Sequence, residues 1–297
     1  MTTYTLTETD EKVLRAIGRY HYATVEQLTR TLFSKSSRTY ASEILARLTK
    51  HSYLYKNLDG PRGIWSLTGK GRSFLEGLGV SLLPRVRHNP IRTGRFWDHI
   101  LSVNDALITC ELYGRHTDGV ELAGMLHERT FHRGPERVEL ILAGKRISTP
   151  VAADGWVDLR IGGYQSCLWL EVDRDTEHIH DWIAKISSII EYYGSGRYEE
   201  RFGTDSLTVL GIAVPKTGKS AQRRMQELLG WTESTLKELG KAQWADVFRF
   251  TAVDPARVWV SPKDEEDLTP TDYFHSAHWL TPFDSRPRPL LGYEEAA

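Results

Sequence analysis

The chain has 297 residues, of which 40% are hydrophobic and 26% are charged. This composition is typical of a globular protein with one large or two ordinary domains, and it excludes disordered and fibrous classes. No apolar run reaches the roughly 18 residues of a membrane span, and the N-terminus does not resemble a signal peptide. We therefore expect a cytoplasmic protein without a membrane partner. Cys110 and Cys167 have no metal-ligand spacing, which argues against a disulfide framework or a cysteine-based zinc site.

Charge is divided unevenly along the chain. Residues 1–96 contain 16 Lys and Arg against 7 Asp and Glu, a net charge of +9. The remaining residues contain 22 against 32, a net charge of −10. Because Lys and Arg supply most non-specific DNA affinity by neutralising phosphates, the basic part is the expected DNA-binding surface.

The first eighty residues predict the order helix, helix, helix, hairpin, helix. Apolar spacing and capping residues place helices from about Thr7 to His21, over 24–33, from Ser36 or Ser37 to Leu48 and from Thr68 to Leu78, with strands over 53–56 and 64–67. This is the order of a winged helix-turn-helix domain, whose third helix enters the major groove of double-stranded DNA. The residues expected at DNA are Ser37, Arg38, Tyr40, Arg47, Lys56 and Arg62. A helical domain used for dimerisation or peptide binding is the alternative.

After this domain the pattern changes twice. Residues 81–96 hold two prolines and four arginines and predict a basic linker. An amphipathic helix over 97–114 and alternating strands and helices then predict an α/β domain with a mixed sheet over 97–255, so that the whole chain is α+β. Residues 256–297 are rich in proline and acid, and we expect a peripheral tail there.

A hairpin in the second domain gathers carboxylates. Gly162-Gly163 is a typical two-residue turn, and if Ile161 pairs with Tyr164, the numbers of opposed residues sum to 325. Asp154 then lies opposite Glu171, and the alternation of strands puts Asp154, Asp158, Glu171 and Asp173 on one face with Trp156 and Trp169. Such acids are costly to bury unless they are solvated, paired with cations or bound to a metal. For Asp158, opposite Cys167, a surface acid is the better interpretation.

A helix over 177–193 follows, with Lys185 at the border of its apolar face. Its stem is long enough to reach over the sheet toward Glu171 and Asp173, although solvated lysines are more common. Strands over 207–214 and 247–253 and a helix over 218–229 complete the α/β pattern.

The order of these features resembles the replication-relaxation family, with a variant of the PD-(D/E)xK nuclease core. The resemblance is carried by the N-terminal domain, by 153–156, 170–177, Lys185 and Tyr192-Tyr193. It implies a DNA-binding protein of a plasmid or mobile element that acts in replication or transfer. By position, Asp154 and Glu171 would be ligands of Mg²⁺ or Mn²⁺, and Asp173 would stand where many such nucleases have lysine. Either Lys185 supplies that charge from the helix, or cleavage has been lost. Glu128 would be a further acid.

Several functional alternatives stay open at this stage. The expected catalytic residues are Asp154, Glu171, Asp173 and Lys185, in metal-dependent nicking or cutting of DNA. The rival is a transcriptional regulator or recruitment factor with an inactive nuclease-like domain. A third hypothesis is nucleotide binding through Lys219, because 213–220 resembles a P-loop, although Pro215 removes one donor. Whether the chain forms a homodimer is left open.

Overall fold

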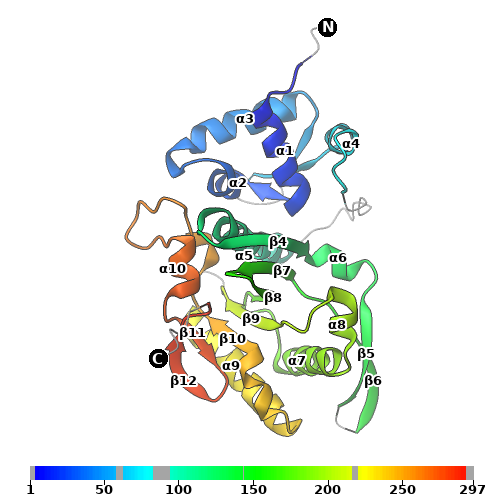
Figure 1. Ribbon diagram of the computed structural model, residues 1–297. Coiled ribbons are helices and arrows are strands. Elements are labelled where there is room, and N and C mark those ends of the chain that lie inside the picture. The colour runs from blue at the N-terminus through cyan, green and yellow to red at the C-terminus, as the bar shows by residue number, and fades with distance from the viewer. Residues whose placement is uncertain (1–3, 58–62, 83–93, 143, 216–219, 292–297) are drawn as a thin grey trace. The chain divides into compact units, whose positions relative to one another are not determined.

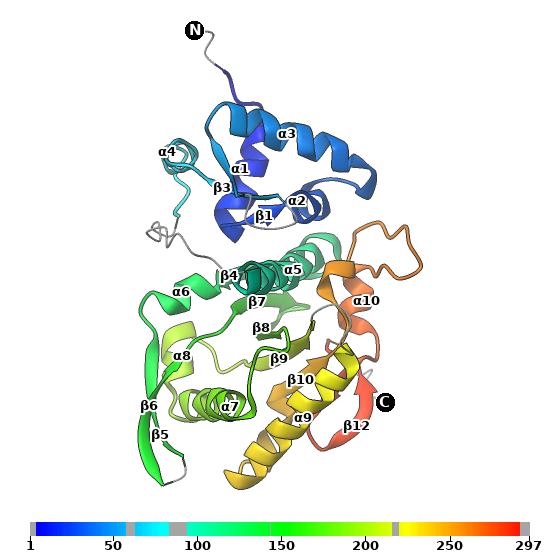
Figure 2. The same cartoon turned by 180° about the vertical axis from the view of Figure 1, so that it is seen from behind.

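The computed structural model describes residues 4–57, 63–82, 94–142, 144–215 and 220–291 (Figures 1 and 2). Contacts divide the chain into two compact units. The first contains residues 1–112 and 256–269, and the second contains 113–255 and 270–297. Most of the expected linker, together with Arg62 and Lys219, lies outside the described residues.

The N-terminal part of the first unit consists of short helices and a small antiparallel sheet. In chain order these are α1 (Glu8–Tyr20), β1 (Ala23–Thr24), α2 (Val25–Leu32), the 3₁₀ turn η1 (Lys35–Ser37), α3 (Arg38–Lys50), β2 (Leu54–Asn57), β3 (Ile64–Leu67) and α4 (Gly69–Gly77). The strand order is β1-β3-β2. These bounds lie within a few residues of the expected ones.

Local capping and apolar spacing explain these helices. Thr7 and Thr24 each accept a hydrogen bond from the third backbone N–H of the following helix, and the side chains of Asp10 and Gln27 accept the backbone N–H of the cap residue. Such capping boxes satisfy N–H groups that a helix start leaves unpaired. The inward positions of α1, α2 and α3 form one core, which includes Leu14, Ile17, Leu28, Ile44, Leu45 and Leu48. Helix α5 (Gly94–His116) follows this region.

The second unit contains a seven-stranded sheet. Its strands are β4 (Val120–His127), β7 (Gly155–Ile161), β8 (Tyr164–Asp173), β9 (Thr208–Ala213), β10 (Phe248–Thr251), β11 (Trp279–Thr281) and β12 (Asp284–Arg288). The strand order is β12-β11-β10-β9-β8-β7-β4. Strands β8, β9 and β10 are parallel, and the remaining pairs are antiparallel. The predicted mixed α/β fold is thus confirmed.

The predicted hairpin register is also confirmed. Ile161 pairs with Tyr164, Asp158 with Cys167 and Gly155 with Leu170. Gly162 and Gly163 have φ of 54° and 90°, a conformation that favours glycine and that a two-residue turn between twisted strands requires. Asp154 lies directly before β7, and its backbone N–H donates to the carbonyl of Leu170 at 3.0 Å.

Two long helices lie together on one face of this sheet, α7 (Ile179–Gly194) and α9 (Ala221–Glu238) (Figure 2). Trp182 and Ile186 of α7 and Leu228 of α9 share a buried core with Val209 and Phe250 of the sheet. The short helix α8 (Arg197–Phe202) packs against α7. Figure 1 shows a separate hairpin beside α7, formed by β5 (Glu136–Leu142) and β6 (Lys145–Val151) after helix α6 (Glu128–His132).

The C-terminal residues differ from the expected tail. Residues 270–291 supply α10 (Pro270–His275), β11 and β12, and Phe274 and Trp279 are fully buried. The short 3₁₀ turns η2 (Ala242–Val247) and η3 (Pro255–Arg257) precede them. Residues 256–269 belong to the first unit instead, where the buried Arg30 donates to the carbonyl of Val258 at 2.9 Å. Within the part of the chain that the structure describes, no helix is both long and apolar enough to span a bilayer.

Candidate functional site

The centre of the candidate site is an ion pair between Glu171 of β8 and Lys185 of α7. The lysine Nζ lies 2.8 Å from Oε2 of Glu171, and the indole N–H of Trp169 donates to Oε1 at 2.7 Å. Glu171 is only 1% exposed. Lys185 reaches the sheet because it lies three residues after the buried Trp182, and residues with this spacing are neighbours on one side of a helix.

Burial and charge control protonation in this cluster. Burial raises the pKa of the Glu171 carboxyl to about 7, the charge of Asp154 adds to the rise, and Lys185 opposes it. Burial alone would lower the pKa of Lys185, but the negative charges of Glu171, Asp154 and Glu177 raise it well above its ordinary value. Lys185 therefore carries a fixed positive charge among three carboxyl groups.

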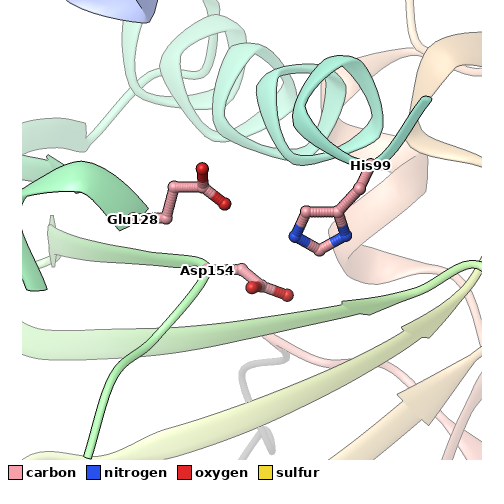
Figure 3. Close-up of side chains that lie close together, drawn as sticks. All are labelled: His99, Glu128 and Asp154. Atoms are coloured by element: carbon pink, nitrogen blue, oxygen red, sulfur yellow. The ribbon is translucent and has the colours of Figure 1, made fainter. Parts of the chain in front are cut away.

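Asp154 lies close to another acid of the same unit, Glu128 (Figure 3). Glu128 begins α6 and Asp154 precedes β7, and a carboxylate oxygen of one lies within 4.8 Å of a carboxylate oxygen of the other. Both residues are buried. The Oδ2 atom of Asp154 accepts the backbone N–H of Val172 at 2.7 Å, which fixes the carboxylate beside β8. His99, the third residue labelled in Figure 3, belongs to α5 and to the first unit.

The donor set of this cluster fits a hard divalent cation. Two buried carboxylates within a few ångströms repel each other unless a proton or a cation compensates their charge. Oxygen ligands of this kind are those that Mg²⁺ and Mn²⁺ prefer. Glu128 and Asp154 offer them directly, whereas both oxygens of Glu171 lie against Trp169 and Lys185.

Asp173 has different surroundings from the other acids. Its Oδ2 atom accepts from Nε of Arg224 at 2.6 Å and from the backbone N–H of Asp175 at 2.8 Å, and its Oδ1 atom accepts from the N–H of Glu177 at 3.2 Å. Arg224, on α9, also donates to the carbonyl of Glu177 at 2.8 Å. We expected Asp173 among the catalytic acids, but here it orders the loop after β8.

That loop delivers Glu177 to the candidate site. The Oε1 atom of Glu177 lies 3.0 Å from Nζ of Lys185, which also contacts Glu171. Sequence reasoning missed Glu177 and Arg224 as parts of this site. The signal available for Glu177 was its position two residues before the helix that carries Lys185, whereas Arg224 lies 51 residues after its partner and gave no local signal.

Asp158 and Tyr192 take no part in this cluster. Asp158 contacts Arg160 at 3.0 Å and Gln165 at 3.1 Å, farther along the hairpin. The hydroxyl of Tyr192 is buried and donates to Glu136 at 2.8 Å, and burial raises its pKa. Tyr192 is thus a core residue.

Three of the residues expected at DNA, Arg38, Tyr40 and Arg47, lie on α3. Arg38 is 70% exposed at the start of this helix, 3.3 Å from Glu26, and Tyr40 is exposed against Phe33. Ser37 lies in η1, and Lys56 on β2 has its ammonium 5.2 Å from the ring centre of Trp65. Arg47 points elsewhere: it donates to the buried Asp10 at 2.7 Å and to the hydroxyl of Tyr4 at 2.7 Å.

Comparison with known proteins gives one result that concerns most of the chain. The model of a family described as replication-relaxation matches residues 14–208. The matched range includes the four residues of the candidate site named above, Glu128, Asp154, Glu171 and Lys185. No curated protein and no solved structure matches.

Proposed function

Because the chain belongs to the replication-relaxation family, we propose that it binds double-stranded DNA and acts in the replication or relaxation of a plasmid or other mobile element. We place this activity in the cytoplasm, where such DNA is found. The first unit is the DNA-binding module in this proposal, as a winged helix-turn-helix. The second unit is a nuclease-like domain that nicks or cuts the bound DNA.

DNA binding is supported by the form and charge of the first unit. The three helices, the hairpin of β2 and β3 and the following α4 have the order of a winged helix, and residues 1–96 have a net charge of +9. In that arrangement α3 enters the major groove, with Arg38, Tyr40 and Ser37 at its start. Lys56 would reach the DNA backbone from the hairpin, and Arg62 would do so from the residues that follow.

The observation that carries the nuclease proposal is the convergence of Asp154, Glu171 and Lys185 at one place on the sheet. Asp154 and the neighbouring Glu128 would hold Mg²⁺ or Mn²⁺, and Glu171 would join them by giving up the contact of one oxygen with Trp169 or Lys185. The ion when bound would polarise a phosphate oxygen and make water more acidic. Lys185 would offset the negative charge that develops on the phosphate during attack by water. Glu177 and Trp169 hold Lys185 and Glu171 in place.

In this proposal, Lys185 replaces the lysine that the usual motif has at the position of Asp173. Many nucleases of this class have a lysine where this chain has Asp173, and an aspartate cannot supply positive charge. Here an ammonium group reaches Glu171 from α7 instead. Losing such a fixed charge at a phosphoryl-transfer site reduces the rate by roughly 100- to 1,000-fold.

Incubation with supercoiled plasmid tests this function. Wild-type protein with Mn²⁺ should give relaxed or linear DNA, and Asp154→Asn, Glu171→Gln and Lys185→Met should not. Asp158→Asn is the matched control, because it removes an acid from the same hairpin that lies outside the cluster. Product formed equally by all of these variants would assign the cleavage to a contaminant.

The rival function is a transcriptional regulator or recruitment factor whose nuclease-like domain is inactive. Its supporting observation is that Lys185 already has two carboxylate partners, so the pair with Glu171 can serve stability alone. Specific DNA binding by the wild type without cleavage under any metal condition would favour this function. ATP binding by the wild type that is lost in Lys219→Ala would instead favour the nucleotide-binding hypothesis.

A further inference from the structure

A segment from the C-terminal third of the chain lies against the turn between α2 and α3. Residues 263–267, here called the acidic loop, read Lys-Asp-Glu-Glu-Asp. The ammonium group of Lys35, the first residue of η1, lies 2.5 Å from Oδ2 of Asp264 and 2.5 Å from Oδ2 of Asp267. All of these residues belong to the first unit.

The acidic loop is anchored at its base. Leu268 donates its N–H to the carbonyl of Arg257 at 3.0 Å, and Trp259 donates to the carbonyl of Leu268 at 2.8 Å. The buried Arg30 of α2 donates to the carbonyl of Val258, which lies between Arg257 and Trp259 in the chain. The ring of Trp259 lies under Lys35, with 5.0 Å between Nζ and the ring centre.

The tip of the acidic loop has its own hydrogen bonds. Oδ2 of Asp267 accepts the backbone N–H groups of Lys263 and Asp264 at 3.0 and 3.1 Å, in addition to Lys35. Although burial works in the opposite direction, the contacts with Lys35 and these N–H groups hold the pKa of Asp267 below its ordinary value. Asp267 is therefore charged and oriented at neutral pH. The loop is preformed around Lys35.

The location of Lys35 gives this contact its meaning. Lysines beside the start of a recognition helix contact DNA phosphates, together with the N–H groups of the helix terminus. Two carboxylate oxygens at hydrogen-bond distance stand where a phosphate would offer its own oxygens. A phosphate and the acidic loop cannot both bind Lys35 in this way.

We propose that the acidic loop is an autoinhibitory phosphate mimic, which occupies Lys35 and weakens DNA binding by the first unit until it is displaced. The inference rests on the proposed function, in that it requires the first unit to bind DNA through α3. Displacement of the loop frees one cation, and neutralising one more phosphate steepens the dependence of log K on log salt by about 0.9.

The test is a set of DNA-binding titrations on the full chain at several salt concentrations. Asp264→Asn/Asp267→Asn removes both charges, while the new amide oxygen at 267 can still accept the two N–H groups. We expect roughly two- to fivefold tighter binding and a salt slope steeper by about 1. The matched control is Glu265→Gln/Glu266→Gln, which removes the same charge from the same loop but no contact with Lys35.

Lys35→Ala completes a double-mutant cycle. Alone it should change affinity little, since Lys35 is already neutralised, and in the asparagine pair it should abolish the gain. Equal gains in the glutamine control and the asparagine pair would overturn the inference in favour of a general charge effect. No gain in the asparagine pair would also overturn it, because the loop would then not weaken DNA binding. If no variant binds DNA, the proposed function itself fails, and the inference fails with it. Circular dichroism melting shows that each variant is folded.

Discussion

Glu171 and Lys185 meet across two elements, strand β8 and helix α7, with 2.8 Å between Oε2 and Nζ. Replacing either residue by an apolar one leaves the buried charge of the other without this partner. The pair therefore offers a direct test of how the buried acids are held.

We predict that Lys185→Met raises the pKa of Glu171 further above about 7, because the cation that opposes the effects of burial and Asp154 is removed. Side-chain carboxyl ¹³C NMR titration of metal-free protein measures this pKa. An acid whose pKa is higher in the folded state than its ordinary 4.5 stabilises the fold fully below that value, and this contribution disappears as the pH rises through the folded pKa. The variant should therefore lose stability from about pH 4.5 upward. Lys237→Met, at an exposed position, is the control and should leave Glu171 unchanged.

Arg224 is predicted to matter for stability far more than its neighbour Arg223. Arg224→Met leaves the buried Asp173 without its cation, which costs about 3 to 5 kcal/mol in the free energy of unfolding. Arg223, whose side chain is 83% exposed, pairs with the next-turn residue Glu227, and Arg223→Met should cost under about 0.5 kcal/mol. Urea unfolding of both variants makes the comparison. Equally small losses of unfolding free energy in both variants would show that the buried Asp173 does not need the charge of Arg224.

A pH effect is expected in the first unit from Asp10, which is 0% exposed. Burial alone would raise its pKa, but hydrogen bonds from Tyr4, the N–H of Thr7 and Arg47 bring it below 3.8. The resulting stability is fully present above about pH 3.8 and is lost as the pH falls through the folded pKa. Asp10→Asn should cost roughly 2 kcal/mol at pH 7 and flatten the acid side of a stability profile measured by urea unfolding.

Arg38 and Arg47 should separate binding from stability, although both lie on α3. Arg38→Ala should weaken DNA binding and lower the salt slope by about 0.9 without affecting thermal unfolding. Arg47→Ala should lower the melting temperature, because it leaves Asp10 buried without its cation. Fluorescence anisotropy with labelled duplex and thermal melts give the two readouts. Reversed effects would assign Arg47 to the DNA surface.

Local sequence signals predicted the elements that depend on neighbours in the chain. The turn Gly162-Gly163 and the alternation of strands fixed the pairing of β7 with β8, since a register shift of one residue would turn every side chain to the wrong face. Helical spacing likewise identified Lys185 as a residue whose stem can reach the sheet. These inferences need only geometry over about twenty residues.

Contacts between distant segments were not accessible in this way. The pairing of Asp173 with Arg224 depends on which helix packs over the end of β8, and the placement of 256–269 against Arg30 and Lys35 depends on a return of the chain after more than 200 residues. The C-terminal strands are short, and proline and acid mask their pattern. Composition thus indicated a tail where the fold has an edge of its main sheet.

The path of the chain also sets the order in which the protein can be completed during synthesis. Residues 256–269 belong to the first unit, although the sequence on both sides of them belongs to the second. A ribosome that has made only the N-terminal third has released Arg30 and Lys35 without Val258, Asp264 and Asp267. The first unit therefore gains its last internal contacts only after residues 256–269 have emerged, and a nascent chain carries Lys35 without its acidic partners until then.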